Sequence, residues 1–194
     1  MLRDLATALA VFIIALILAI VPAWWLFVYA PGKAAISVGP WQTSLQTGSS
    51  NAGMYVRAYV AISGLFALNP SEAIYFTALR DDSGQPLQAR CTYAIAGKPV
   101  SGRWWSLTAY ADDNFLIPNK ANRFSYNMGN LAMGADGAFR VMAASTEQPG
   151  NWLPTGTGSG GFNLLFRIYN PAPELLADPG KVALPSIKRV GACA

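Results

Sequence analysis

The first hydrophobic pattern in the chain is an uninterrupted apolar stretch near the N-terminus. Residues 5–30 carry no charged side chain. As an α-helix with a rise of about 1.5 Å per residue they would extend for roughly 39 Å, more than the roughly 30 Å of a bilayer's hydrocarbon core. Trp24, Trp25 and Tyr29 cluster toward the end of the stretch, where aromatic side chains favour the level of the lipid headgroups. The pattern predicts a transmembrane anchor over residues 1–30.

A cleaved secretory signal is the main alternative for this segment. Arg3 precedes the apolar stretch, and Val28 to Ala30 form a weak small-residue cleavage site. The stretch is longer than the ~7–15 apolar residues of a typical signal, so we favour a retained anchor. A buried core helix would need a polar side, which the stretch lacks. Anchor and signal alike carry the rest of the chain across a membrane.

Two further segments precede the bulk of the domain. Residues 31–53 are rich in Gly, Ser and Pro, which predicts a linker with one short strand near residues 41–45. From Met54 to Leu68 apolar residues recur at three- and four-residue spacings, which predicts a helix packed on a core. Asn69 and Pro70 would end that helix.

Alternation of apolar and polar residues replaces the helical spacing after residue 70. Aromatic and β-branched residues alternate with polar ones between Asp, Asn, Gly and Pro turns, at intervals of about ten residues. The segments are 72–79, 91–96, 103–110, 122–127, 138–145, 162–169 and 182–190, with one helical turn near Glu174. This pattern favours a mainly β fold, an antiparallel jelly-roll-like sandwich with one packed helix, over a parallel α/β sheet. We therefore expect a β-rich domain over residues 54–194.

The composition removes several classes of chemistry. The chain of 194 residues contains no histidine, which excludes Ser-His-Asp and Cys-His catalysis and His-ligated metal centres. Hydrophobic residues make up 53% of the chain and charged residues 12%, enough apolar material for one packed core. The net charge of +4 comes from scattered Lys and Arg side chains, which do not form the basic stripe that follows a nucleic acid. We expect no nucleic acid partner and no cofactor.

Cys91 and Cys193 are the two cysteines of the chain. In a chain expected outside the cytoplasm, an even number favours a disulfide bond over two free thiols. A bond between them would close a loop of about 100 residues and would stabilise the fold by up to about 4.7 kcal/mol in the chain-entropy account. It would also tie down the C-terminus.

Gly156, Gly158 and Gly161 have the G-x-G-x-x-G spacing of a dinucleotide-binding loop. That loop requires a strand before it and a helix that begins at its end, so that free N–H groups meet the phosphates. Here residues 151–154 precede the glycines and a predicted strand follows them. We therefore interpret the glycines as a flexible connection between strands and expect no nucleotide.

The acidic residues suggest two further kinds of site. Asp112, Asp113 and Asn114 could coordinate calcium, but the twelve-residue calcium-loop pattern is missing and these residues are typical of tight turns. We expect no metal site. A pair of carboxylates could instead hydrolyse a glycosidic bond, and the candidates by residue type alone are Glu72, Asp112, Asp136 and Glu174.

An aromatic set with interspersed arginines is the best candidate for a binding surface. Such rings could stack on a sugar or contact an apolar ligand while guanidinium groups orient its polar head. In strands these residues are more often core on one face and amphipathic surface on the other. Trp152 differs because it lies in a loop beside the Gly-rich connection. The set comprises Trp104, Trp105, Tyr110, Phe124, Tyr126, Trp152, Arg103, Arg123 and Arg167.

A series of short motifs runs in a fixed order from residue 57 to residue 185. The most specific are W-S-L-T-x-Y at 105–110, N-W-L-P at 151–154 and R-x-Y-x-P at 167–171; the others include RAYVAISGLFAL, SEAIYF, DDSGQPL, IPNKANRFSYN and LLFRIYNP. Together they resemble the bacterial domain-of-unknown-function family 1214. The resemblance implies a β-rich, jelly-roll-like domain and an association with the companion family 1254, which is absent from this chain. It supplies no catalytic residues.

On these grounds we expect a single-pass inner-membrane protein with its C-terminal domain in the periplasm. We expect a non-catalytic envelope module that binds a partner protein or an envelope ligand. The first alternative is a carboxylate-dependent hydrolase acting on an envelope glycan or ester, and the second is a structural subunit whose apolar patch docks another copy. The residues expected at a ligand site are Trp105, Tyr110, Arg123, Asn151, Trp152, Arg167 and Tyr169.

Overall fold

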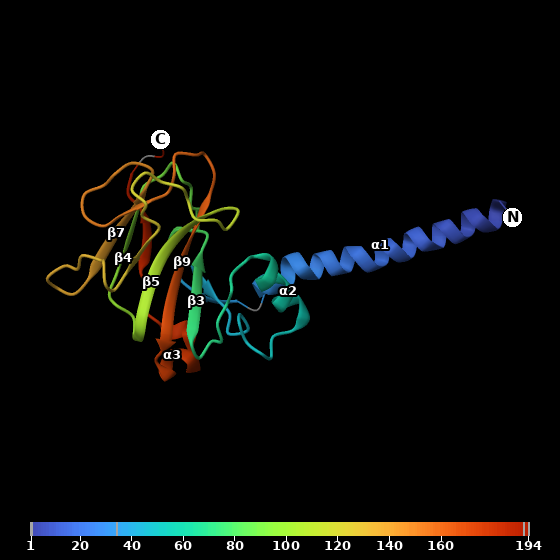
Figure 1. Cartoon of the computed structure of the whole chain (residues 1–194), viewed down its shortest axis with the longest axis horizontal. Helices are drawn as coiled ribbons and strands as arrows, with labels where there is room; N and C mark the ends of the chain where they lie inside the picture. Colours follow the sequence, from blue (N-terminus) through green and yellow to red (C-terminus); the bar gives the residue numbers. More distant parts are fainter. Residues whose placement is uncertain (1, 34, 192, 194) are drawn as a thin grey trace.

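In the computed structural model a long N-terminal helix projects from a β-rich body (Figure 1). The structure describes residues 2–33, 35–191 and 193, and the side chains of residues 2 and 27–33 are outside that description. Helix α1 spans Leu2–Lys33, and its segment Arg3–Leu26 is long and apolar enough to cross a membrane, as a signal sequence also is. Trp24 is 67% exposed; the side chain of Tyr29, expected at the same interface, lies outside the described residues.

The larger of two sheets has six antiparallel strands in the order β1-β2-β3-β9-β5-β6. Their bounds are Ile36–Val38, Trp41–Thr43, Ala73–Ala78, Phe162–Pro171, Gly102–Ala111 and Ser125–Asn127. The segment expected to hold one strand within a linker therefore contributes two strands, β1 and β2. Trp41 on β2 is fully buried, so these residues form part of the sandwich.

The smaller sheet has four strands in the order β10-β4-β7-β8. Their bounds are Ser186–Arg189, Tyr93–Gly97, Phe139–Ala144 and Trp152–Pro154. Two of the pairings are antiparallel, whereas β7 and β8 run parallel. The expected antiparallel sandwich therefore contains one parallel pair at this edge, where residues 145–151 return the chain alongside β7.

The two sheets pack face to face around one hydrophobic core. Trp105 on β5 shows how they meet, because its ring stacks on Phe139 of the smaller sheet and on Phe166 of β9, with centroids 5.1 Å apart in both pairs. Side chains alternate along a strand, so β5 places Leu107 and Ala109 in the same core. The disulfide bond between Cys91 and Cys193 is confirmed, as is the mainly β sandwich; the jelly-roll connectivity stays a prediction.

Three short helices complete the fold: α2 (Met54–Ile62), α3 (Pro173–Ala177) and the 3-10 helix η1 (Pro179–Lys181). The expectation of a core-packed helix over residues 54–68 is wrong in two respects. Helix α2 ends at Ile62, followed by Gly64 and Phe66 with positive φ angles. None of its side chains is buried, and it lies beside the C-terminal end of α1, at the junction of that helix with the body (Figure 1).

Candidate functional site

The outer face of the six-stranded sheet, which points away from the core, carries the best-defined polar site. Because Trp105 points inward on β5, its neighbours at 104, 106, 108 and 110 point outward. The strand register places Arg167 of β9 between Ser106 of β5 and Tyr75 of β3. The same register places Trp104 opposite Tyr169. We call this surface the Arg167 face.

Arg167 is half-buried and its hydrogen bonds go to uncharged groups. Its Nη2 donates to the Tyr110 hydroxyl at 2.7 Å, and its Nη1 donates to Thr108 Oγ1 at 3.3 Å. The guanidinium carbon lies 5.5 Å from the centroid of the Tyr110 ring. Within the described part of the chain no carboxylate forms an ion pair with Arg167. A guanidinium has five N–H donors, so most of its capacity to bind an anion is open.

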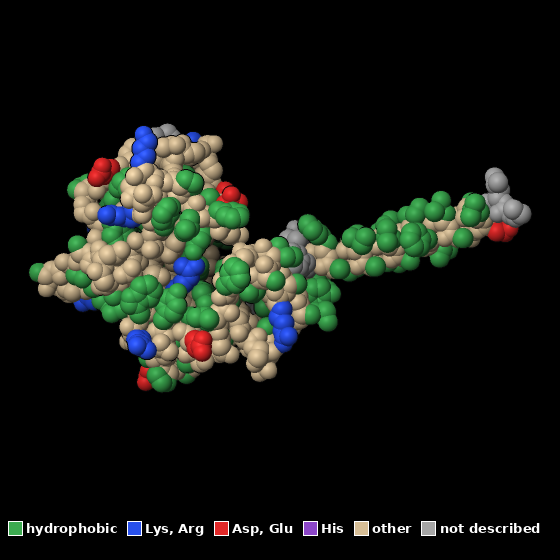
Figure 2. All heavy atoms as spheres, viewed as in Figure 1, with side chains coloured by type: hydrophobic (Ala, Val, Ile, Leu, Met, Phe, Trp, Pro, Cys, Tyr) green, Lys and Arg blue, Asp and Glu red, His purple; other side chains and the backbone are tan. Residues whose placement is uncertain are grey.

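Aromatic rings surround this guanidinium. Burial raises the pKa of the Tyr75 hydroxyl above its ordinary value, and that hydroxyl accepts a hydrogen bond from the Leu68 N–H at 2.8 Å. The rings of Trp104 and Tyr169 meet edge to face with centroids 5.2 Å apart. Figure 2 shows a basic side chain surrounded by hydrophobic ones over the strands labelled β5 and β9 in Figure 1. The surface combines one positive charge with apolar ring edges.

The segment after α2 covers part of the Arg167 face. Leu65 and Ala67 pack against Tyr75 and Leu165, so the β3 side of the face is closed. A cavity of about 50 Å³ remains between residues 63–65, Tyr110 and Arg167. Because a water molecule occupies about 30 Å³, this space admits one small group such as a carboxylate oxygen pair.

Arg123 and Trp152 lie together elsewhere, joined through Tyr126. The Arg123 guanidinium donates to the Tyr126 hydroxyl and lies 5.2 Å from that ring's centroid. The same hydroxyl accepts the backbone N–H of Trp152 at 2.9 Å, and the Trp152 indole donates to the Ala144 carbonyl at 2.9 Å. These bonds fasten β8 to β6 and β7, so both predicted residues have a structural role here.

Asn151 is likewise engaged in holding the chain together. Its Nδ2 donates to the carbonyls of Ala132 and Arg140 at 2.8 and 3.0 Å, and its Oδ1 accepts the Ala132 N–H at 2.9 Å. Trp105 is 1% exposed. Of the predicted ligand-binding residues, the structure brings together Tyr110, Arg167 and Tyr169 on one accessible face.

The acidic residues considered as catalysts or calcium ligands lie in turns or at the ends of elements. Asp112 accepts the Gly161 N–H at 2.8 Å, Asp113 that of Phe115 at 3.0 Å, and Asp136 that of Ala138 at 3.0 Å. Glu72 directly precedes β3, and Glu174 lies in α3. Among the described residues no group of three or more His, Cys, Asp or Glu could hold a metal ion.

The glycine-rich connection runs from a strand to a strand. The short strand β8 precedes it, and β9 follows it without an intervening helix. A Cβ atom on Gly161 would lie 2.6 Å from Asp112 Oδ1, so a larger residue there would displace the carboxylate that accepts the Gly161 N–H. This contact accounts for one glycine of the G-x-G-x-x-G spacing.

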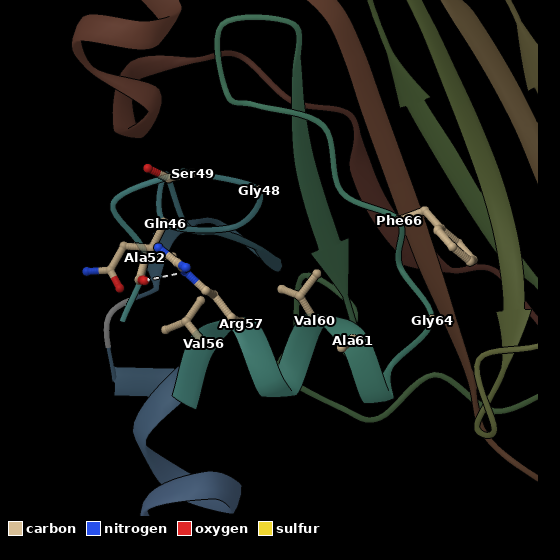
Figure 3. Close-up of a pocket in the computed structure, with 10 residues that line it drawn as sticks. All are labelled: Gln46, Gly48, Ser49, Ala52, Val56, Arg57, Val60, Ala61, Gly64 and Phe66. Carbon is tan, nitrogen blue, oxygen red and sulfur yellow. Dashed lines mark hydrogen bonds between the residues drawn. The ribbon is translucent and has the colours of Figure 1, made fainter. Parts of the chain in front are cut away.

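A second hollow, of about 450 Å³, lies between α2 and the loop 46–52 (Figure 3). Val56, Arg57 and Val60 point from the helix toward this loop. The Arg57 Nε donates to the Ala52 carbonyl at 2.8 Å, and its Nη2 donates to the Ser50 carbonyl. The guanidinium thus ties α2 to the body, which leaves the walls of this hollow mainly apolar.

The comparison with protein families bears on the Arg167 face directly. The family model described as "Protein of unknown function (DUF1214)" matches residues 72–173, more than half of the chain. The chain belongs to the DUF1214 family. The DUF1214 match contains β3, β5 and β9 and thus every strand of the Arg167 face, whereas α1 and α2 precede it.

Two solved structures resemble this DUF1214 protein. The VPA0106 protein from Vibrio parahaemolyticus is 26% identical with a TM-score of 0.59, over 73% of this chain and 36% of that one. An uncharacterised protein from Burkholderia cenocepacia is 15% identical with a TM-score of 0.43, over 87% of this chain and 38% of that one; this weak likeness carries no argument. The chain thus spans just over a third of the length of each. No curated protein matches the sequence.

Sequence reasoning missed several members of this DUF1214 surface. Trp104 stood in the aromatic set but not among the expected site residues, and Tyr75, Ser106 and Thr108 were not considered. The period-two pattern of residues 72–79 contained a signal, because Ile74 and Phe76 are core residues and the tyrosine between them must point to the opposite face.

Proposed function

We propose that this DUF1214 protein is a membrane-anchored envelope module that binds a partner protein or an envelope ligand without catalysing a reaction. The ligand meets the Arg167 face with an anionic group, a carboxylate or a phosphate, attached to an apolar or ring-shaped body. Arg167 holds the charge, and Trp104, Tyr110 and Tyr169 contact the adjoining body.

The observation that carries this proposal is the pairing of Arg167 with neutral hydroxyls only. Tyr110 and Thr108 fix the direction of the guanidinium without neutralising its charge. Hydrogen bonds between a guanidinium and a carboxylate or phosphate are about twice as strong as those between neutral groups. A partly desolvated arginine of this kind therefore gains most from an external anion, and the neighbouring rings add apolar contact.

The positions of the acidic residues support a binding module over the alternative hydrolase. A glycosidase needs two carboxylates that face one substrate, with the pKa of one of them raised. Asp112, Asp113 and Asp136 instead accept backbone hydrogen bonds in turns. Each of these carboxylates is thus held by backbone N–H groups at a turn, and none of them lines the cavity beside Arg167.

The partner is proposed to be a separate chain of the companion family 1254. This chain covers 36% of the longer Vibrio structure that it resembles, so a comparable assembly would need additional protein. The anchor is proposed to be retained, with α1 in the inner membrane and the sandwich in the periplasm. The Cys91–Cys193 disulfide supports a periplasmic location of the sandwich, because disulfide bonds persist in oxidising compartments.

The test uses the full-length protein in nanodiscs of zwitterionic lipid, so that the bilayer supplies no competing net charge. Calorimetric titrations with glucuronate, benzoate and inorganic phosphate are compared with a titration with neutral glucose. We expect at least one anionic probe to bind the wild type and Arg103→Gln but not Arg167→Gln; Arg103 is an exposed arginine on β5, the strand next to β9. Equal binding by Arg167→Gln, or no binding of any anion, would reject the Arg167 face as an anion site.

A further inference from the structure

Helix α2 presents an apolar side to its surroundings. Met54, Tyr55 and Ile62 are 76%, 38% and 75% exposed. With 3.6 residues per turn these three positions fall within about 100° of one another around the helix axis. Val56 and Val60 lie on the opposite side and face the hollow beside the loop 46–52 (Figure 3). The helix is thus attached to the body by one side and exposes hydrophobic residues on the other.

Phe66, just beyond the helix, does not belong to this exposed side. It is 93% exposed, but it borders the hollow together with Val56 and Val60, on the side of α2 that faces the loop 46–52 (Figure 3). The apolar surface that lacks a partner within the described chain is therefore that of Met54, Tyr55 and Ile62.

The position of α2 relative to α1 indicates which medium the exposed side of α2 meets. The membrane-spanning segment Arg3–Leu26 contains 24 residues, about 36 Å at 1.5 Å per residue. The remaining residues to Lys33 add about 10 Å, which places the end of α1 in the headgroup layer beyond a hydrocarbon core of roughly 30 Å. Because α2 contacts α1 beside that end, its level is the boundary between headgroups and acyl chains.

Hydrophobic side chains continue from the long helix onto the adjoining part of the body (Figure 2). A helix that lies in a membrane interface has an apolar side turned to the acyl chains and the rest turned to water or protein. The exposed side of α2 is apolar, as the side turned to the acyl chains would be. Arg57, the only charged residue of α2, is turned toward the body by its hydrogen bonds to the Ala52 and Ser50 carbonyls.

We propose that α2 lies in the interfacial layer of the bilayer, with Met54 and Ile62 inserted at the acyl boundary. The inference rests on the retained anchor of the proposed function. Insertion of α2 would also affect the proposed binding site, because residues 63–65, which follow α2, line the cavity beside Arg167. The membrane then fixes the segment that closes one side of the Arg167 face, so the face is held at a constant orientation to the lipid surface.

The test attaches a nitroxide spin label to single cysteines in the full-length protein in nanodiscs, with the native pair oxidised. Labels at Met54→Cys and Ile62→Cys report on the proposed insertion. Met128→Cys is the matched control, since it is 48% exposed and follows β6 at the opposite edge of the sheet. Leu16→Cys, in the middle of α1, reports on the anchor itself.

We expect collisions with oxygen to exceed those with a water-soluble nickel chelate several-fold at positions 16, 54 and 62, with the reverse at position 128. Aqueous behaviour at 54 and 62 with a lipid-embedded label at 16 would overturn the inference and leave the anchor standing. An aqueous label at 16 would overturn the anchor as well. Protection of 54 and 62 from both reagents, with spin–spin broadening between labels in discs holding two copies, would assign the surface to a second copy and overturn the inference.

Discussion

Replacement of Trp41 by phenylalanine tests how the N-terminal strands are held in the sandwich. Trp41 has no exposed surface, its indole Nε1 donates to the Pro185 carbonyl at 2.7 Å, and its ring meets Phe166 edge to face at 6.0 Å. Phenylalanine keeps the ring contact but leaves the carbonyl unpaired, which costs about 1–3 kcal/mol. The smaller ring loses buried contact worth about 1 kcal/mol more. We expect the free energy of unfolding to fall by about 2–4 kcal/mol.

Two other tryptophans provide matched controls for this substitution. Trp104 is 38% exposed on the Arg167 face, so Trp104→Phe is expected to change stability by about 0.5 kcal/mol or less. Trp105 is buried, and within the described chain its Nε1 has no hydrogen-bond partner. Trp105→Phe therefore loses volume without losing a bond, and its effect is expected to fall between the other two.

The assay is urea denaturation of the full-length protein in detergent micelles, followed by far-ultraviolet circular dichroism. An unchanged m value with a lower midpoint would show that stability alone has changed. A Trp41→Phe effect no larger than that of Trp104→Phe would refute the conclusion that β2 is fastened to the segment before β10.

Three further variants test other parts of the fold. Asn151→Ala removes three hydrogen bonds to the backbone and should lower the free energy of unfolding in urea by about 2–3 kcal/mol; an unchanged free energy would contradict its structural role. Replacing Cys91 and Cys193 together by alanine opens a loop with a sequence separation of 102, so stability should fall by up to about 4.7 kcal/mol, whereas a loss below about 1 kcal/mol would argue against a stabilising bond. Burial disfavours the charged form of Asp81, but hydrogen bonds from Ser83 and Gln85 outweigh it and lower the pKa of that carboxyl. The ionised Asp81 therefore stabilises the fold above its ordinary pKa of about 3.9, and this stabilisation is lost as pH falls below that value. Asp81→Asn should reduce the difference between the urea midpoints at pH 7 and pH 3. An equal difference in the wild type and in Asp81→Asn would contradict this.

The strands could be predicted because their signal is local. The segments 72–79, 103–110 and 162–169 alternate apolar and polar residues. The first contains β3, and the other two cover all but the ends of β5 and β9. The strand β8 escaped prediction because three residues are too few to show a period, and its parallel pairing with β7 depends on contacts across residues 145–151. The sequence pattern thus predicted the sandwich but not its edges.

The helix at Met54 shows a different limit. Apolar spacing identifies the hydrophobic side of a helix but not the medium that covers it. A core, a bilayer and a partner protein all produce the same spacing, and α2 in this structure has no buried side chain. The prediction that this helix packs on the core was wrong because a protein core, the most frequent of these three surroundings, was assumed.

The candidate site was predictable in residue type but not in position. Trp104 and Trp105 are adjacent in sequence and lie on opposite faces of β5, one beside Tyr169 and the other in the core. The position of the second sheet determines which of these two side chains points into the core. No local sequence pattern indicates where that sheet lies. Asn151 could not be recognised as a structural amide for the same reason, since Ala132 and Arg140 come near it only in the folded chain.

The ligand is proposed to bind where Arg167 projects from β9. The decisive experiment is native mass spectrometry of the full-length protein, released in nanodiscs from the membranes of its own host. An additional bound mass, an anionic small molecule or a partner chain, is expected on the wild type and on Arg103→Gln but not on Arg167→Gln. An equal bound mass on Arg167→Gln, or none on any of the three proteins, would show that Arg167 does not hold a ligand.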